Sequence, residues 1–205
     1  MMASPPITPR SSQRTISGGG KPGSFAPLIG VYAAYLWRLE HRGHNWNLIM
    51  TAPVRPFCLY FAKFCVVAKM AVLTQAWLLV LFVFGGKCGA TLPGFPPPEI
   101  VLWLLRGVIG GLAIIALQLL LSMVIRNFAL PVLIALGGSV AGLLAVSEDL
   151  GLYWPYSLMI MGMNSNRTED VMAGGIWGFF LSCAVFLTVF LLIANVMLTK
   201  RDVET

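Results

Sequence analysis

The sequence is poor in charged residues. Only 11% of its 205 residues are Asp, Glu, Lys or Arg, whereas 58% are hydrophobic. A soluble domain carries about 25% charged residues, so this deficit excludes an ordinary soluble protein and indicates an integral membrane protein. The apolar residues form continuous runs of helical length, unlike the short alternating segments of a membrane barrel. We therefore predict an all-α, polytopic helical membrane protein.

Motifs of nucleotide-binding and hydrolytic enzymes are also missing. The sequence contains neither the G-x-x-x-x-G-K-[ST] loop that cradles phosphates nor the G-x-S-x-G turn that presents a nucleophilic serine. Glu40, His41 and His44 have the order E-H-x-x-H, whereas zinc proteases have H-E-x-x-H, and no third ligand is evident nearby. A polar helix face explains them better than a catalytic metal does. We expect no enzyme activity, metal or cofactor in this chain.

The excess of basic residues does not indicate a nucleic-acid partner. The net charge is +6, but the Lys and Arg residues are spread along predicted loops, with no basic stripe and no recognisable nucleic-acid module. They are better explained as topology determinants, because basic residues collect on the cytoplasmic side of a bilayer. If the last four long apolar segments each cross once, one side receives Arg38, Arg42, Arg55, Arg126, Lys200 and Arg201. That side, which includes the C-terminus, is predicted to be cytoplasmic.

The chain divides into a tail and one membrane domain. Residues 1–24 are rich in Ser, Pro and Gly and are predicted to be disordered, whereas residues 25–205 are predicted to form a single transmembrane domain. Its long apolar segments are 25–37, 57–84, 100–125, 128–146 and 176–198. The first is shorter than the roughly 20 residues that cross a bilayer. It is expected to be tilted, interfacial or buried among the others, so four to five transmembrane helices are predicted, and the side of the N-terminal tail stays open.

Three basic residues lie inside the predicted spans. Lys63 and Lys69 belong to segment 57–84, and Arg106 lies about two turns into segment 100–125. Lys69 is about 18 Å along its helix, where a lysine costs a few kcal/mol unless it faces protein or water. One face of 57–84 is therefore predicted to point inward. Lys63, Lys69 and Arg106 are the candidates for lining a transport path.

A shorter apolar stretch, 152–163, follows the fourth long segment. Its 12 residues contain Pro155 and are too few to span, so they are predicted to form a re-entrant or interfacial segment on the external side. Tyr153, Trp154 and Tyr156 are expected at the level of the lipid headgroups.

Close helix packing is predicted from G-x-x-x-G spacings, in which small residues let two backbones approach. These spacings occur at Gly107/Gly111, Gly138/Gly142 and Gly174/Gly178. We expect at least one of them to lie at a helix–helix contact.

The polar junction 38–63 separates the first two apolar segments. Its apolar positions Leu39, Trp46, Ile49 and Met50 share much of one helical face. Prolines 53 and 56 then end the pattern. We predict a short amphipathic helix, 39–50, that lies on the membrane surface and is gripped by a soluble partner.

The same stretch resembles the type-2 ABC permeases, in particular those of the lantibiotic-immunity and bacitracin-resistance kind. In that family an acidic residue opens a cytoplasmic coupling helix, a stretch ending in proline follows, and the next span has an early lysine. Glu40, Trp46, Pro53 and Lys63 match those positions. The resemblance implies that a separate ABC ATPase binds the coupling helix. The partner-binding residues would then be Glu40, Arg42, His44, Trp46, Ile49, Met50 and Pro53.

The resemblance further implies a bacterial cytoplasmic membrane, the lipid bilayer as surroundings, and a homodimer or heterodimer with a second permease subunit. The expected cargo is an amphipathic peptide antibiotic or similar apolar molecule, exported by ATP hydrolysis on the separate subunit. Such permeases usually have six spans, and the apolar segments here would match the second to sixth. Either the true start lies upstream of Met1 or this is a shortened member. The alternative function is a membrane accessory or sensor protein that binds a partner complex without transporting.

Overall fold

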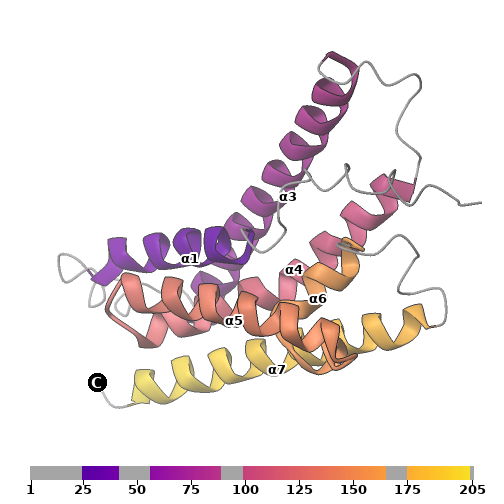
Figure 1. The fold of residues 1–205 in the computed structure, drawn as a ribbon. Helices are drawn as coiled ribbons and strands as arrows, with labels where there is room; N and C mark the ends of the chain where they lie inside the picture. Colours follow the sequence, from indigo (N-terminus) through magenta and orange to yellow (C-terminus); the bar gives the residue numbers. More distant parts are fainter. Residues whose placement is uncertain (1–24, 42–55, 89–98, 165–174, 204–205) are drawn as a thin grey trace, which may run out of the picture.

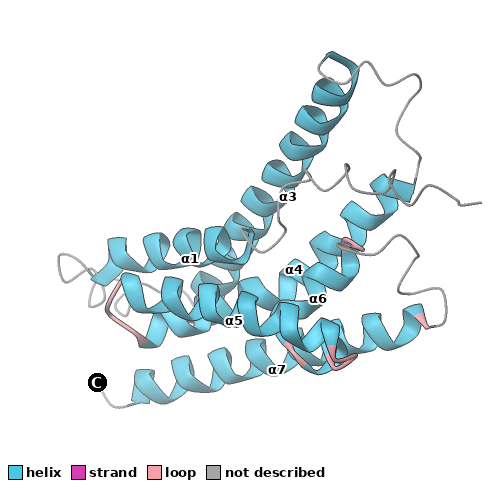
Figure 2. Ribbon diagram, in the orientation of Figure 1, coloured by secondary structure: helices cyan, strands magenta, loops and turns pink. Residues whose placement is uncertain are grey.

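The computed structural model describes residues 25–41, 56–88, 99–164 and 175–203, and every regular element within them is a helix (Figures 1 and 2). The elements are α1 (Phe25–His41), α3 (Pro56–Cys88), α4 (Glu99–Val124), α5 (Ala129–Ser147), the 3-10 turn η2 (Gly151–Tyr153), α6 (Pro155–Gly162) and α7 (Ile176–Val203). The helical fold class is confirmed. Helix α3 continues to Cys88 and α7 to Val203, a few residues beyond the predicted ends of their segments.

Four of these helices, α3, α4, α5 and α7, are long and apolar enough to cross a membrane. Helix α1, with 17 residues, is not among them. It buries Ala26, Ile29, Ala33 and Trp37 and packs on α4 and α5. Of the placements expected for this segment, the structure therefore has the one in which it is packed among the other helices.

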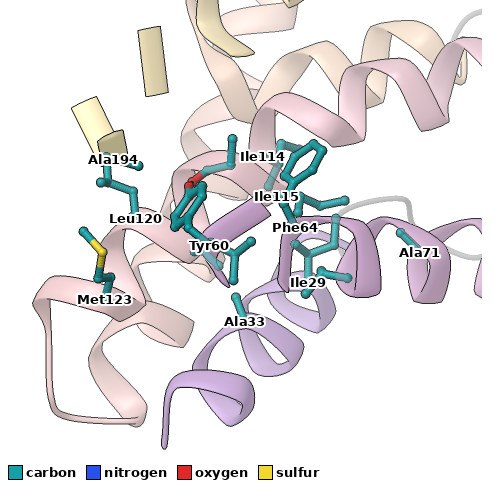
Figure 3. Close-up of a cluster of buried hydrophobic side chains, with 14 of the residues drawn as sticks. Ile29, Ala33, Tyr60, Phe64, Ala71, Ile114, Ile115, Leu120, Met123 and Ala194 are labelled. Atoms are coloured by element: carbon teal, nitrogen blue, oxygen red, sulfur yellow. The ribbon is translucent and has the colours of Figure 1, made fainter. Parts of the chain in front are cut away.

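Helix α4 is the centre of the bundle and the most buried of the four spanning helices. It packs against α1, α3, α6 and α7. Figure 3 shows the cluster where α1, α3 and α4 meet, with Tyr60 lying among Ile114, Ile115 and Leu120. The Tyr60 hydroxyl donates a 2.7 Å hydrogen bond to the carbonyl oxygen of Ala116. An unpaired hydroxyl group would be costly in a hydrocarbon environment, so this hydrogen bond fixes the register of α3 against α4.

One face of α3 packs inward, but it is not the face of Lys69. The inward stripe consists of Tyr60, Phe64, Val67, Ala71 and Gln75, which are three or four residues apart and so share a side of the helix. Lys69 lies two residues from Val67, on the opposite side, and is exposed. The inward face is thus confirmed, but the prediction that a deep lysine would mark it is wrong.

The outer half of α3 diverges from the other helices (Figure 1). Its large side chains are correspondingly exposed, with Trp77 at 62%, Phe82 at 58% and Phe84 at 66% of their full area.

The chain turns back into the bundle after α5. Asp149 has a positive φ of 58°, and the amide of Leu150 donates to the carbonyl oxygen of Ala145 at 2.8 Å. This is the pattern in which a left-handed residue ends a helix and reverses the chain. Residues 150–154 then lead inward to α6, which packs among α4, α5 and α7.

Candidate functional site

The predicted partner-binding residues lie at the junction between α1 and α3. Glu40 belongs to the last turn of α1. The other six, Arg42, His44, Trp46, Ile49, Met50 and Pro53, lie outside the described residues, so the helix 39–50 stays a prediction. The structure does describe the two helices that enter and leave this junction.

Lys63 ties those two helices together. Its ammonium nitrogen Nζ donates a hydrogen bond to the carbonyl oxygen of Leu36 at 3.3 Å and lies 5.1 Å from the centroid of the Trp37 ring. Both acceptors belong to the C-terminal part of α1, where carbonyl oxygens carry partial negative charge. A cation over an indole face adds about 0.5–2 kcal/mol. The two helices that flank the junction are therefore held against each other at Lys63.

The three candidate path residues do not come together. Lys63 lies against the C-terminal part of α1, Lys69 is exposed on the outer side of α3, and Arg106 is 9% exposed within α4. Tyr60 contacts Ala116, while Gln75 lies beside Gly107, so α3 and α4 run antiparallel.

Along α3, Lys63 precedes Gln75 by 12 residues, or about 18 Å. Lys63 and Arg106 therefore lie at different depths, and a role of the three charges in transport stays a prediction.

Helix α6 forms direct backbone contacts with α4 and α5. A Cβ atom added at Gly110 of α4 would lie 2.6 Å from the carbonyl oxygen of Leu158, and one added at Gly162 would lie 2.6 Å from that of Arg106. On the α5 side, a Cβ at Gly142 would lie 3.1 Å from the amide nitrogen of Ser157. The approaches at Gly110 and Gly162 are close enough to require glycine.

Two of the three G-x-x-x-G pairs contribute to this contact. Gly138 and Gly142 face Tyr156 and Ser157, and Gly107 and Gly111 face the side chains of Met163 and Met159. The prediction of a glycine helix–helix contact is confirmed. Of the third pair, Gly174 lies outside the described residues.

Gly110 and Gly162, where an added Cβ would come closest to backbone atoms, are absent from the sequence predictions. The sequence signal that could have indicated close packing at Gly110 is the Gly110-Gly111 doublet within an apolar segment.

Polar side chains satisfy the irregular backbone around α6. Trp154 Nε1 donates to the carbonyl oxygen of Gly138 at 3.0 Å, and Ser182 Oγ donates to that of Leu152 at 2.5 Å. Ser157 Oγ bonds to the carbonyl oxygens of Gly151 and Trp154. Non-helical backbone within a membrane protein is tolerated where it is buried in protein or lines a water-filled cavity, and here it is buried and paired.

Tyr156, expected at headgroup level, is buried inside the helix bundle. It is 4% exposed, and its hydroxyl accepts a 2.7 Å hydrogen bond from Gln118 Nε2. Its ring lies against Gly138, nine residues before the end of α5, or about 14 Å along that helix. From there α6 leads to Gly162, which packs against the backbone of Arg106. Tyr153 and Trp154 are exposed.

Comparison with known families places part of the chain. A family model described as ABC-2 family transporter protein matches residues 23–142, from just before α1 to within α5. This covers more than half of the chain.

The chain belongs to the ABC-2 transporter family. It is a membrane permease component of an ABC transporter, which implies association with an ABC ATPase subunit. No curated protein and no solved structure matches the chain. The ABC-2 match contains the junction 38–63. Most of this junction lies outside the described residues, whereas Lys63 fixes its two flanking helices to each other.

Proposed function

We propose that this ABC-2 permease subunit works in an ATP-driven exporter and is moved by its ATPase through the helix predicted at 39–50. Family membership supports the association with an ATPase, and the Lys63 contacts support transmission of movement from the junction to α1 and α3. A push on the junction would shift α1 and α3 together. Both helices pack on α4, and α4 carries α6 on its glycine face. The movement would thus reach α6 through tightly packed backbone contacts, which transmit displacement.

The proposed assembly contains a second permease subunit, identical or different. Lys69 supports this arrangement, because it is exposed on a spanning helix and has no acidic partner among the described residues. A lysine facing lipid at this depth costs a few kcal/mol. A neighbouring subunit or a water-filled path along the outer side of α3 would remove that cost.

The proposed cargo is an amphipathic peptide antibiotic or a similar apolar molecule, and the proposed location is the bacterial cytoplasmic membrane. The C-terminal ends of α1 and α7 and the α4–α5 turn lie at one end of the bundle (Figure 1). Arg38, Arg126 and Lys200 belong to these parts. Basic residues favour the cytoplasmic side, so this end, with the C-terminus, is proposed to be cytoplasmic. Loss of resistance to a lantibiotic or bacitracin on deletion of the gene would test the cargo class.

The deciding experiment is purification of the tagged protein from its native membrane in mild detergent. We expect an ABC ATPase to co-purify in stoichiometric amount, and Glu40→Lys to abolish this while membrane insertion is unchanged. Glu99→Lys is the matched control, since Glu99 is an exposed acid at the first residue of α4. Co-purification that survives Glu40→Lys would refute the coupling role. Recovery without an ATPase would favour the accessory or sensor function.

A further inference from the structure

A small cleft opens between the C-terminal part of α1, the end of α4 and the start of α5. It is open on one side, and its empty space counted together with the solvent at its mouth is about 190 Å³. Arg38 and Arg126 both line it and both are exposed. No Asp or Glu is among the lining residues that the structure describes. The described part of the cleft wall therefore offers two permanent positive charges and no acid.

The position of Arg38 is fixed by an aromatic contact. Its guanidinium carbon Cζ lies 5.4 Å from the centroid of the Phe128 ring, a separation typical of a cation–π pair. Phe128 is the N-cap residue of α5 and also lines the cleft. The guanidinium group is thus held beside the first turn of α5.

The N-terminus of α5 adds to the positive potential. Phe128 and Pro131, from its cap and first turn, form part of the cleft wall. Asn127 Oδ1 accepts the amide hydrogen of Ala129 at 2.9 Å, and Phe128 makes no side-chain capping bond. The partial positive charge of this helix end favours an anion.

An independent observation comes from Ser122. This serine of α4 is 2% exposed and lines the cleft, yet its Oγ atom has no hydrogen-bond partner within the part of the chain that the structure describes. A buried polar group left unpaired costs about 1–3 kcal/mol. A hydroxyl needs an acceptor, and an oxyanion entering between the two arginines would supply one.

The site lies at a membrane surface, because it is where the spanning helices α4 and α5 are joined. We propose that this cleft binds a phosphate group, supplied by the headgroup of a phospholipid. Guanidinium groups bind phosphate oxygens in a planar, paired geometry, and basic pockets between transmembrane helices bind anionic headgroups. The Ser122 hydroxyl and the α5 N-terminus complete the donor set. This inference does not depend on the cargo or on the ATPase.

Lipid retention tests the proposal. The full-length protein is purified in detergent and titrated with phosphatidylglycerol or with diacylglycerol of the same acyl chains, and bound lipid is counted by native mass spectrometry. We expect phosphatidylglycerol to bind the wild type about tenfold more tightly than it binds Arg38→Gln or Arg126→Gln, since each variant loses one charge-assisted bond. Lys200→Gln, which removes an exposed charge from the end of α7, should behave as the wild type.

Three results would overturn the proposal. Unchanged phosphatidylglycerol affinity in both arginine variants would show that the arginines do not form the site. Equal retention of diacylglycerol would show that the phosphate group is not recognised. Displacement of phosphatidylglycerol by inorganic phosphate at millimolar concentration would overturn the lipid as the source and assign the cleft to free phosphate.

A second variant tests the proposal even if the arginine variants misfold. Ser122→Ala removes an unpaired hydroxyl, so the lipid-free protein should melt at the same temperature or higher. The rise in melting temperature on adding phosphatidylglycerol should shrink. Ser139→Ala is the matched control, because its buried hydroxyl is already bonded to Ala135 away from the cleft, and it should keep the full lipid-induced rise. An undiminished rise in Ser122→Ala would contradict the role of this hydroxyl.

Discussion

The contact between α4 and α6 can be tested by adding one methyl group. In Gly110→Ala the new Cβ would lie 2.6 Å from the carbonyl oxygen of Leu158 and 2.7 Å from its carbon. These are backbone atoms, so no side-chain rotation relieves the clash. Ordinary contact begins at 3.4 Å, so α6 and α4 must separate by about 0.8 Å, the difference between the two distances.

The expected cost follows from two opposing effects. Overpacking a close contact costs about 1–3 kcal/mol, while alanine in a helix gains up to about 1 kcal/mol over glycine. The net destabilisation is about 1–2 kcal/mol, which lowers the melting temperature of a chain of this size by roughly 2–8 °C. Gly137→Ala in α5 is the matched control, because its added Cβ meets nothing within 4 Å, and its melting temperature should be equal or higher.

Both variants would be measured by thermal unfolding in the same detergent, together with transport in reconstituted vesicles. Gly110→Ala should melt at a lower temperature and transport less, because α6 no longer sits on α4. Equal melting temperatures for the two alanine variants would refute the argument that backbone contact at Gly110 holds α6 in place.

Two further predictions concern the polar contacts. Tyr156→Phe should lower stability by about 1 kcal/mol because Gln118 Nε2 loses its 2.7 Å acceptor; the double variant Gln118→Leu/Tyr156→Phe should recover most of this in thermal unfolding, and additive losses would contradict the pairing. Lys63→Met should reduce transport in reconstituted vesicles while the ATPase still co-purifies, because it removes the bond to Leu36 and the cation over Trp37. Lys200→Met serves as its control. Full transport by Lys63→Met would show that the Lys63 contacts do not transmit the movement.

The helix boundaries were predictable because their signals are local. Glu99 begins α4 directly after three prolines, and both proline and acidic residues are favoured at the start of a helix. The Arg126-Asn127 turn separates α4 from α5, with Asn127 accepting from Ala129. The short stretch with Pro155 was also correctly separated from the spans, because its length and proline rule out a crossing.

The inward faces were not predictable in the same way. Lys69 was expected to mark the buried side of α3 and instead lies opposite it. Tyr156 was expected at the headgroups and instead bonds to Gln118 inside the bundle. A tyrosine beside a loop looks the same in the sequence whether it lies at the headgroups or inside the bundle. The hydroxyl's partner lies 38 residues away, so only the packing of α6 on α4 brings the pair together.

The sequence by itself determined that the chain is a helical membrane protein, where most of its helices begin and end, and that a polar junction precedes α3. The tertiary structure alone decided which face of each helix is inside, that α6 packs among α4, α5 and α7, and that Arg38, Ser122 and Arg126 share one cleft. The physical reason lies in the solvent. In water an apolar stripe marks the buried face of a helix, but in lipid the outward face is equally apolar. The packing face is then chosen by small residues and by single hydrogen bonds, which leave little periodic signal in the sequence.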